Sequence, residues 1–175
     1  MCLKKRSKRT RSRRSAVSNQ VSAGAIVFSI KNRQILVLLL VQNNEFYGRS
    51  TKAETIDIGP KGHLERGESL LHAAHREIKE ELGIGLHLDT NFKDSIEYKF
   101  EETDRKTGKK MKVNKKVIYY VAFLNYHERK NIVLSEEHKR SIFLPIDEAI
   151  KYVPYENSKQ VLNNAKTYIT LKYLT

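Results

Sequence analysis

The chain has 175 residues and a formal net charge of +13 at pH 7, and hydrophobic residues make up 39% of it. This length and apolar content suit one globular domain, and no apolar run approaches the ~20 residues of a membrane-spanning helix. A single cysteine, Cys2, excludes an internal disulfide, and the basic balance favours polyanionic partners such as nucleotides or nucleic acid.

Residues 1–20 are the most basic part of the chain, with eight lysines and arginines and no acidic residue. Their apolar content is too low to offset chain entropy, so we expect a disordered arm, followed by one folded domain over residues 21–175. The arm resembles targeting segments and RNA-binding segments, and it equally suits a solvated tail. We expect a cytoplasmic protein without a membrane partner, with nuclear or organellar targeting by the arm as the alternative.

Two β-rich segments follow the arm. Residues 21–30 and 34–41 are rich in valine, isoleucine and leucine, and Lys31-Asn32-Arg33 between them predicts a hairpin turn. Residues 43–53 are polar and irregular, and a short strand is expected over residues 54–58.

An amphipathic helix is predicted over residues 69–82. Ser69 is a favourable N-cap and Gly83 is suited to the position just past the helix end. An apolar stripe at helical spacing runs along it, formed by Leu71, Ala74, Ile78 and Leu82.

The remainder of the chain predicts two strands and two helices. Residues 91–100 and 116–123 have strand character, and the charged segment 101–113 between them is expected to be a loop. Residues 147–153 predict a short helix, and residues 156–173 predict a packed C-terminal helix.

Three glutamates of the first predicted helix lie on a different face from its apolar stripe. Glu77, Glu80 and Glu81 stand at i, i+3 and i+4, which brings their side chains together. Such crowded negative charge is typical of a bound cation, although a solvated acidic face has the same pattern. Ligation by oxygen alone favours Mg²⁺, Mn²⁺ or Ca²⁺ over zinc.

Residues 62–84 contain the complete pattern of a known motif. Gly62, Glu68, Arg76-Glu77, Glu80-Glu81 and Gly83-Ile84 stand at the spacing G-x5-E-x7-R-E-U-x-E-E-x-G-U, where U is apolar. This segment resembles the Nudix box, whose family hydrolyses nucleoside diphosphates linked to another group with the help of a divalent metal. The resemblance implies a mixed α/β protein with the Nudix fold, an α/β/α sandwich around a mixed central sheet.

Segments outside the box narrow the resemblance. Pro60-Lys61-Gly62-His63, Lys116-Val117-Ile118-Tyr119, Leu134-Ser135-Glu136-Glu137-His138 and Asp147-Glu148-Ala149 occur in this order. The set is similar to the asymmetrical bis(5′-nucleosyl)-tetraphosphatases, the diadenosine tetraphosphate hydrolases. The chain departs from that group in two places. Ile56-Asp57-Ile58-Gly59 lacks the aromatic residue that often precedes Pro-Lys-Gly-His, and an insertion lies around residues 104–113.

The resemblance implies roles for particular residues. It makes Glu77, Glu80 and Glu81 ligands of Mg²⁺, with Mn²⁺ as an alternative, and Glu80 or Glu81 the base for water. Glu137 is a further metal ligand or base, Arg76 orients a carboxylate, and His63 donates to a bridging or leaving oxygen. The residues expected to bind substrate are Lys61, Gly62, Tyr98, Lys116 and Tyr119.

The predicted function is Mg²⁺-dependent hydrolysis of a dinucleoside polyphosphate, with water attacking phosphorus and diadenosine tetraphosphate giving ATP and AMP. One alternative is a 5′-end RNA pyrophosphohydrolase or decapping enzyme that contacts RNA through the basic arm. A second is a non-catalytic RNA-binding subunit, against which the complete glutamate set argues. ADP-ribose and deoxynucleoside triphosphates are further candidate substrates, and the oligomeric state is left open.

Overall fold

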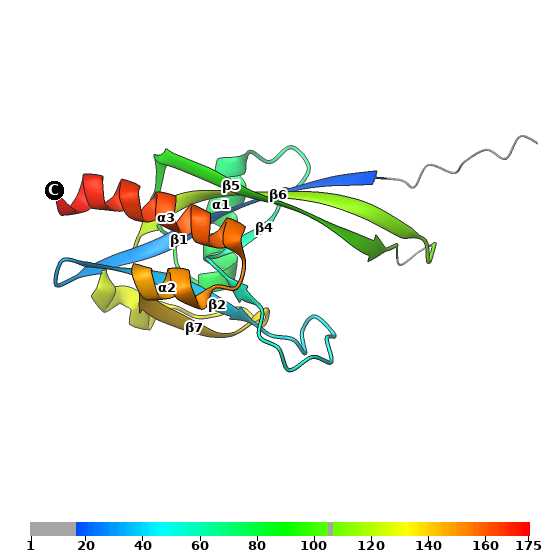
Figure 1. Ribbon diagram of the computed structural model, residues 1–175, viewed down its shortest axis with the longest axis horizontal. Helices are drawn as coiled ribbons and strands as arrows, with labels where there is room; N and C mark the ends of the chain where they lie inside the picture. The colour runs from blue at the N-terminus through cyan, green and yellow to red at the C-terminus, as the bar shows by residue number, and fades with distance from the viewer. Residues whose placement is uncertain (1–16, 105–106) are drawn as a thin grey trace, which may run out of the picture.

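The computed structural model describes residues 17–104 and 107–175, and within them it forms one mixed seven-stranded sheet (Figure 1). The strands are ordered β3-β2-β1-β6-β5, with β4 paired to β1 and β7 to β2. Strands β1 and β6 run parallel, and the other pairs are antiparallel. The strand bounds are β1 (Val17–Lys31), β2 (Gln34–Gln42), β3 (Ile56–Asp57), β4 (Lys61–His63), β5 (Leu88–Thr103), β6 (Lys110–Phe123) and β7 (His138–Pro145).

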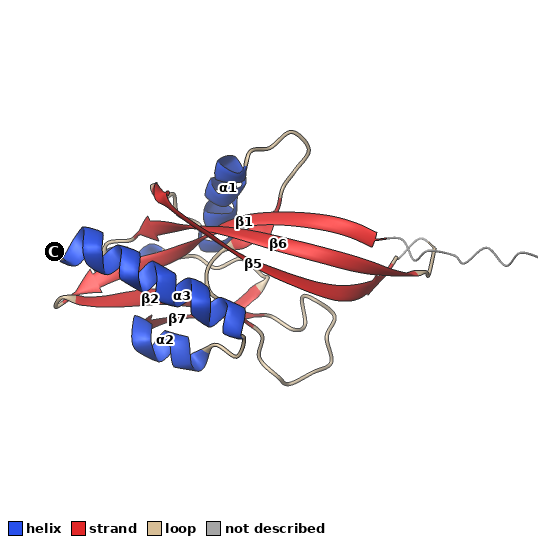
Figure 2. Cartoon of the chain, turned by 45° about the horizontal axis from the view of Figure 1, so that its top comes forward, coloured by secondary structure: helices blue, strands red, loops and turns tan. Residues whose placement is uncertain are grey.

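Helices cover both faces of this sheet, so the expected α/β/α sandwich is confirmed (Figure 2). Helix α1 (Leu70–Leu82) packs on one face, and α2 (Ile146–Tyr152) and α3 (Glu156–Ile169) pack on the other. A 3₁₀ helix, η1 (Tyr126–Asn131), precedes β7, and a wider π-helical turn, η2 (Thr170–Leu174), continues α3. None of the helices in the described part of the chain is long and apolar enough to cross a membrane.

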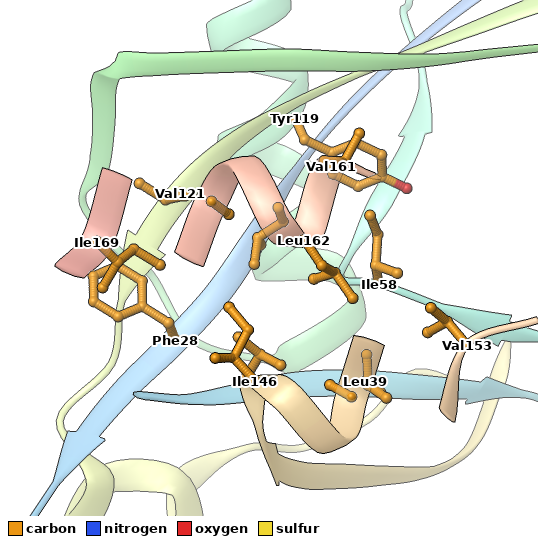
Figure 3. Packing of buried hydrophobic residues seen from close by; sticks show 14 of the residues in the cluster. Phe28, Leu39, Ile58, Tyr119, Val121, Ile146, Val153, Val161, Leu162 and Ile169 are labelled. Atoms are coloured by element: carbon orange, nitrogen blue, oxygen red, sulfur yellow. The ribbon is translucent and has the colours of Figure 1, made fainter. Parts of the chain in front are cut away.

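The core has one layer on each side of the sheet. Strand β2 explains why, because its apolar residues alternate between the two layers. Val37 and Leu39 pack with α2 and α3, whereas Leu38 and Leu40 pack with α1. A strand buried on both faces reads as a continuous apolar run. Figure 3 shows the layer beneath α2 and α3, where Phe28, Leu39, Tyr119, Leu162 and Ile169 lie together.

The predicted hairpin and first helix are confirmed. Asn32 and Arg33 form the turn between β1 and β2 with φ of 49° and 59°, the left-handed pair that matches strand twist. In α1, the Ser69 hydroxyl accepts a backbone N–H of the first turn at 3.2 Å, and Gly83 follows with φ of +68°. The predicted stripe packs against the sheet, with Ile78 fully buried.

Two predicted boundaries are wrong. Residues 17–20, which were predicted as part of a disordered arm, belong to β1 and pair with residues 112–115 of β6. The rest of the predicted arm, residues 1–16, lies outside the described residues. The expected loop at residues 101–113 is mostly strand, because β5 and β6 continue as a long antiparallel ribbon (Figure 1). The many charged residues suggested a loop, but in the sheet they lie opposite residues of unlike charge, as Glu101 lies opposite Lys112, and such pairs stabilise the strands.

Candidate active site

Helix α1 presents its three clustered glutamates at different depths. Glu77 and Glu81 are buried against the sheet, with 8% and 4% of their surface exposed. The side chain of Glu80 is 58% exposed. Packing of the apolar stripe sets the rotation of the helix, so the carboxylates of Glu77 and Glu81 point inward and that of Glu80 remains exposed to solvent.

Arg76 joins these acids into one cluster. Its guanidinium binds both carboxylate oxygens of Glu68 at 2.9 Å, and it donates to Glu77 at 2.6 Å and to Glu80 at 2.9 Å. It also donates to the backbone carbonyl of His63 at 2.9 Å. Hydrogen bonds from Arg76 lower the pKa of Glu68 to about 2. Arg76 therefore fixes Glu77 and Glu80 relative to β4 and to the loop before α1.

Gly62 lets strand β4 approach this cluster closely. A Cβ atom at this position would overlap the carboxylate of Glu77, well inside the 3.0 Å that such contacts respect. The neighbouring backbone N–H of Lys61 donates to Glu81 at 3.3 Å. Both glutamates are thus held against the backbone of residues 61–62.

A buried group of charges lies behind the glutamates. The ammonium of Lys61 contacts Asp57 at 3.0 Å, and His138 lies 3.7 Å from Asp57 and 3.6 Å from Glu81. Burial would raise the pKa of Asp57, but Lys61 and a hydrogen bond from Gln42 hold it well below its usual value. The same Asp57 carboxylate raises the pKa of Lys61 against the effect of burial.

Glu81 has the most perturbed carboxyl group of the cluster. Burial raises its pKa to about 9, with Glu77 and Asp57 adding to the increase and Lys61 opposing it. Burial likewise raises the pKa of Glu77, although Arg76 counteracts it. Negative charge concentrated in this way is a property of sites that accept a cation or a proton.

Two adjoining cavities open beside the cluster. The first has a volume of about 410 Å³ and the second about 530 Å³, and both are lined by Gln42, Arg49, Lys61 and Tyr98. The first also meets Asp57, Tyr119, Tyr155 and Asn157. The second also meets Tyr47, Gly62, His63, Glu77, Glu80, Phe100, Lys115 and Glu137. Aromatic and cationic groups therefore surround both cavities, and the glutamates Glu77, Glu80 and Glu137 lie in the second.

The structure brings most of the expected site residues to these cavities. Tyr98 is 39% exposed where the two cavities meet, whereas Tyr119 is almost fully buried and forms part of the first cavity's wall. Glu137, outside the box, faces the second cavity and accepts a hydrogen bond from the Tyr47 hydroxyl at 2.6 Å. Burial and this bond raise the pKa of Tyr47, so its hydroxyl stays a donor.

His63 lines the second cavity beside Gln20 and Lys115. Its Nε2 atom is 3.0 Å from the Gln20 side-chain oxygen and 3.2 Å from the Lys115 ammonium, and one tautomer satisfies only one of these contacts. Burial, followed by the charges of Lys115 and Lys61, lowers the pKa of His63. The imidazole thus belongs to the cationic side of the second cavity.

Lys116, which was expected to bind substrate, lines neither of these two cavities. Side chains alternate along β6, and Lys115 lines the second cavity, so its neighbour points away. Lys116 instead pairs with Glu97 at 2.7 Å. The adjacent Lys115 lines the second cavity, where Lys116 was expected.

Several cavity residues were not predicted as site residues. Asp57 carries a usable signal, since it stands four residues before Lys61 in the segment where the resemblance predicted an aromatic residue. The sequence carries no such signal for Tyr47 and Arg49, because a polar irregular segment does not reveal which side chains turn inward. Tyr155 reaches the first cavity from just before α3, a contact that only the tertiary structure supplies.

The acidic residues fit a divalent cation by their chemistry. In the described part of the chain, no three acidic, histidine or cysteine side chains are grouped as a preformed metal cluster. The Glu81 Oε2 atom, however, is buried without a hydrogen-bond partner among the described residues. An unpartnered carboxylate oxygen beside two further carboxylates is a donor set that suits Mg²⁺ or Mn²⁺.

Comparisons with known proteins agree with this geometry. A family model described as NUDIX domain matches residues 18–165. The asymmetrical bis(5′-nucleosyl)-tetraphosphatase of Sus scrofa is 32% identical over 113 residues, which are 63% of this chain and 69% of that protein. The protein of the same name from Caenorhabditis elegans is 32% identical over 110 residues, covering 63% of this chain and 73% of that one.

Solved structures of Nudix proteins also match the fold of this chain. A binary complex of C. elegans Ap4A hydrolase matches with a TM-score of 0.68 and 27% identity, over 86% of this chain and 98% of that chain. A MutT protein from Methanosarcina mazei matches with a TM-score of 0.59 at 20% identity, over 86% and 95% of the two chains. The second likeness concerns the fold alone.

Proposed function

The chain belongs to the NUDIX domain family and is a Nudix hydrolase, and on this premise we propose that it uses Mg²⁺ to hydrolyse diadenosine tetraphosphate to ATP and AMP. The two adjoining cavities carry the proposal, since three glutamates line one of them and Arg49, Lys61 and Tyr98 lie at their junction. Two relatives that are named for this activity support the same substrate class.

The proposed reaction is substitution at phosphorus by water. Water attacks the phosphorus atom of the AMP half, the bond from that atom to the bridging oxygen breaks, and ATP leaves with the bridging oxygen. Glu137 faces the second cavity together with Glu77 and Glu80, and its contact with Tyr47 fixes its orientation. We assign Glu137 as the carboxylate that accepts the proton of the attacking water.

The α1 glutamates are the proposed Mg²⁺ ligands, with Glu77 and Glu81 buried and Glu80 at the rim. A bound divalent cation neutralises phosphate charge and acidifies a coordinated water. Arg76 already holds Glu77 and Glu80 through charge-assisted bonds, so these two carboxylates are oriented in advance.

Cations on the other side of the second cavity suit the phosphate chain. Lys61, His63 and Lys115 lie together there, and burial followed by the charge of Lys61 lowers the pKa of Lys115. Repulsion between the ammonium groups of Lys61 and Lys115 is relieved when an anion binds between them. Tyr98 offers an exposed ring at the junction, on which a nucleobase can stack.

The decisive experiment is hydrolysis in ¹⁸O-labelled water. We expect ATP and AMP in equal amounts with the label in AMP, whereas two molecules of ADP contradict asymmetric cleavage. A parallel panel of capped RNA, triphosphate RNA, ADP-ribose and deoxynucleoside triphosphates, compared by kcat/KM, tests the alternative substrates. If RNA with a 5′ cap or triphosphate is preferred, the substrate assignment is wrong.

Paired substitutions test the acidic site. Glu80→Gln and Glu81→Gln should each remove most Mg²⁺-dependent turnover, because each loses a proposed ligand or its charge. Glu148→Gln, on the exposed surface of α2, is the matched control and should behave like the wild type. Retention of turnover in both α1 variants contradicts the proposed site.

A further inference from the structure

We propose that Arg49 is a polyphosphate-binding residue at the junction of the two cavities, and that it makes the enzyme selective for substrates with a long phosphate chain. This inference deepens the proposed function and rests on it. Arg49 belongs to the segment between β2 and β3, and its side chain lines both cavities.

Arg49 is held in place from several sides although it is exposed. Its guanidinium donates to the Gln42 side-chain oxygen at 2.6 Å and lies 4.7 Å from the ring centroid of Tyr47. Its backbone N–H donates to the Asn44 carbonyl at 2.8 Å. A guanidinium has five N–H donors, and the bond to Gln42 uses one of them. The group is thus positioned in advance and retains donors for an anion.

A hydrogen-bonded chain connects Arg49 to Lys61 along the junction. Gln42 accepts from Arg49 and donates to Asp57 at 2.8 Å, and Asp57 in turn binds Lys61 at 3.0 Å. Three of these residues line both cavities, and Asp57 lines the first. The amide and the carboxylate therefore fix the spacing of two cations along the path between the cavities.

The distribution of charge along the cavities indicates the role of Arg49 and Lys61. The acids of the second cavity lie on α1 and at Glu137, whereas Arg49 and Lys61 lie where that cavity joins the first. A short pyrophosphate can be held by the acidic site with its metal and by Lys61. A longer chain carries additional charge through the junction, and Arg49 is the cation that meets it. Guanidinium binds phosphate oxygens in pairs, which suits it to this position.

Binding of inorganic tripolyphosphate tests the inference without turnover. Calorimetric titration in the absence of divalent metal should show Arg49→Ala raising Kd roughly 10- to 100-fold, as expected for one lost charge-assisted contact. Arg49→Lys should recover part of the affinity, because it keeps the positive charge but lacks the planar pair of N–H donors of a guanidinium. Lys52→Ala removes an exposed positive charge from the same segment and should bind as the wild type does.

Kinetics then separate binding from structural effects. In Arg49→Ala the KM for diadenosine tetraphosphate should rise while kcat stays near the wild-type value, and the KM for ADP-ribose, which has two phosphates, should change less. If the wild type does not cleave diadenosine tetraphosphate, the proposed function fails, but the tripolyphosphate titration still decides the role of Arg49. Equal Kd values for Arg49→Ala and Lys52→Ala, or no measurable binding by the wild type, overturn the inference.

Discussion

Gly62→Ala is a small substitution that tests how the site is assembled. The added methyl group would overlap the Glu77 carboxylate, and the nearest oxygen must withdraw by about 1 Å before the contact reaches 3.0 Å. The obstructing atoms are the end of a flexible side chain, so the backbone of β4 can stay in place. The substitution should therefore displace a proposed metal ligand while it preserves the fold.

The expected magnitude follows from this displacement. A misplacement of about 1 Å in a catalytic group costs on the order of 100-fold in rate, or about 2.7 kcal/mol of transition-state stabilisation. We expect kcat/KM for diadenosine tetraphosphate to fall by that factor and the Mg²⁺ concentration for half-maximal rate to rise. Overpacking should lower the free energy of unfolding by only about 1–3 kcal/mol. Steady-state rates over a Mg²⁺ series and thermal unfolding measure both effects.

Gly85→Ala is the control, because a Cβ atom there meets nothing within 4 Å and the φ angle is not left-handed. It introduces the same methyl group a few residues after α1 and should leave both rate and stability unchanged. If Gly62→Ala matches this control in rate and in Mg²⁺ requirement, the close approach of β4 to Glu77 is not part of the site. Rate loss accompanied by global unfolding would show that the backbone, and not the carboxylate, had moved.

Three further predictions concern other contacts. Asp57→Asn leaves Lys61 buried without its counterion and should lower the free energy of unfolding at pH 7 by about 3–5 kcal/mol. Because Lys61 depresses the folded-state pKa of Asp57, this contribution is present above about pH 4 and is lost as pH falls through the folded value. Urea unfolding from pH 7 to pH 2 should therefore show a flatter profile for the variant, and identical profiles would contradict the ion pair. Asp89→Asn should cost about 2 kcal/mol in urea unfolding, since the Tyr168 and Tyr173 hydroxyls lose a charged acceptor at 2.7 and 2.9 Å, while KM stays unchanged. Arg76→Lys keeps the charge but loses the fork that binds Glu68, Glu77 and Glu80, so kcat should fall roughly 10-fold, and wild-type kinetics would refute the role of Arg76.

The elements that the sequence predicted well are those with a strong local signal. Helix α1 has an N-cap, an apolar stripe and a terminal glycine, and the β1–β2 hairpin has a short polar turn between two apolar runs. The ribbon of β5 and β6 was missed in part because its stability comes from pairing between strands. The charged residues of segment 101–113 look like a loop until residues such as Glu101 and Lys112 are placed opposite each other.

The residues of the candidate site likewise divide into those that the sequence could predict and those that it could not. The acids of α1 and the Pro-Lys-Gly-His segment could be predicted, because their spacing along one chain segment is itself the signal. Lys116 and Lys115 could not be told apart, since the choice depends on which face of β6 meets the cavities. Arg49 and Tyr47 reach the site from a segment without periodic structure, and only tertiary contacts such as the bond from Tyr47 to Glu137 bring them there.

Asp57 shows how the departure from the expected motif changes the chemistry of the cleft. Where an aromatic residue was expected before Pro-Lys-Gly-His, the chain has a buried carboxylate that binds Lys61 and Gln42. Aromatic surface is supplied instead by Tyr98 on β5 and by Tyr155 before α3, both of which line the first cavity. The position is thus used to fix cations along the junction, and the proposed substrate, with a phosphate chain and a nucleobase, would use both these cations and the aromatic rings.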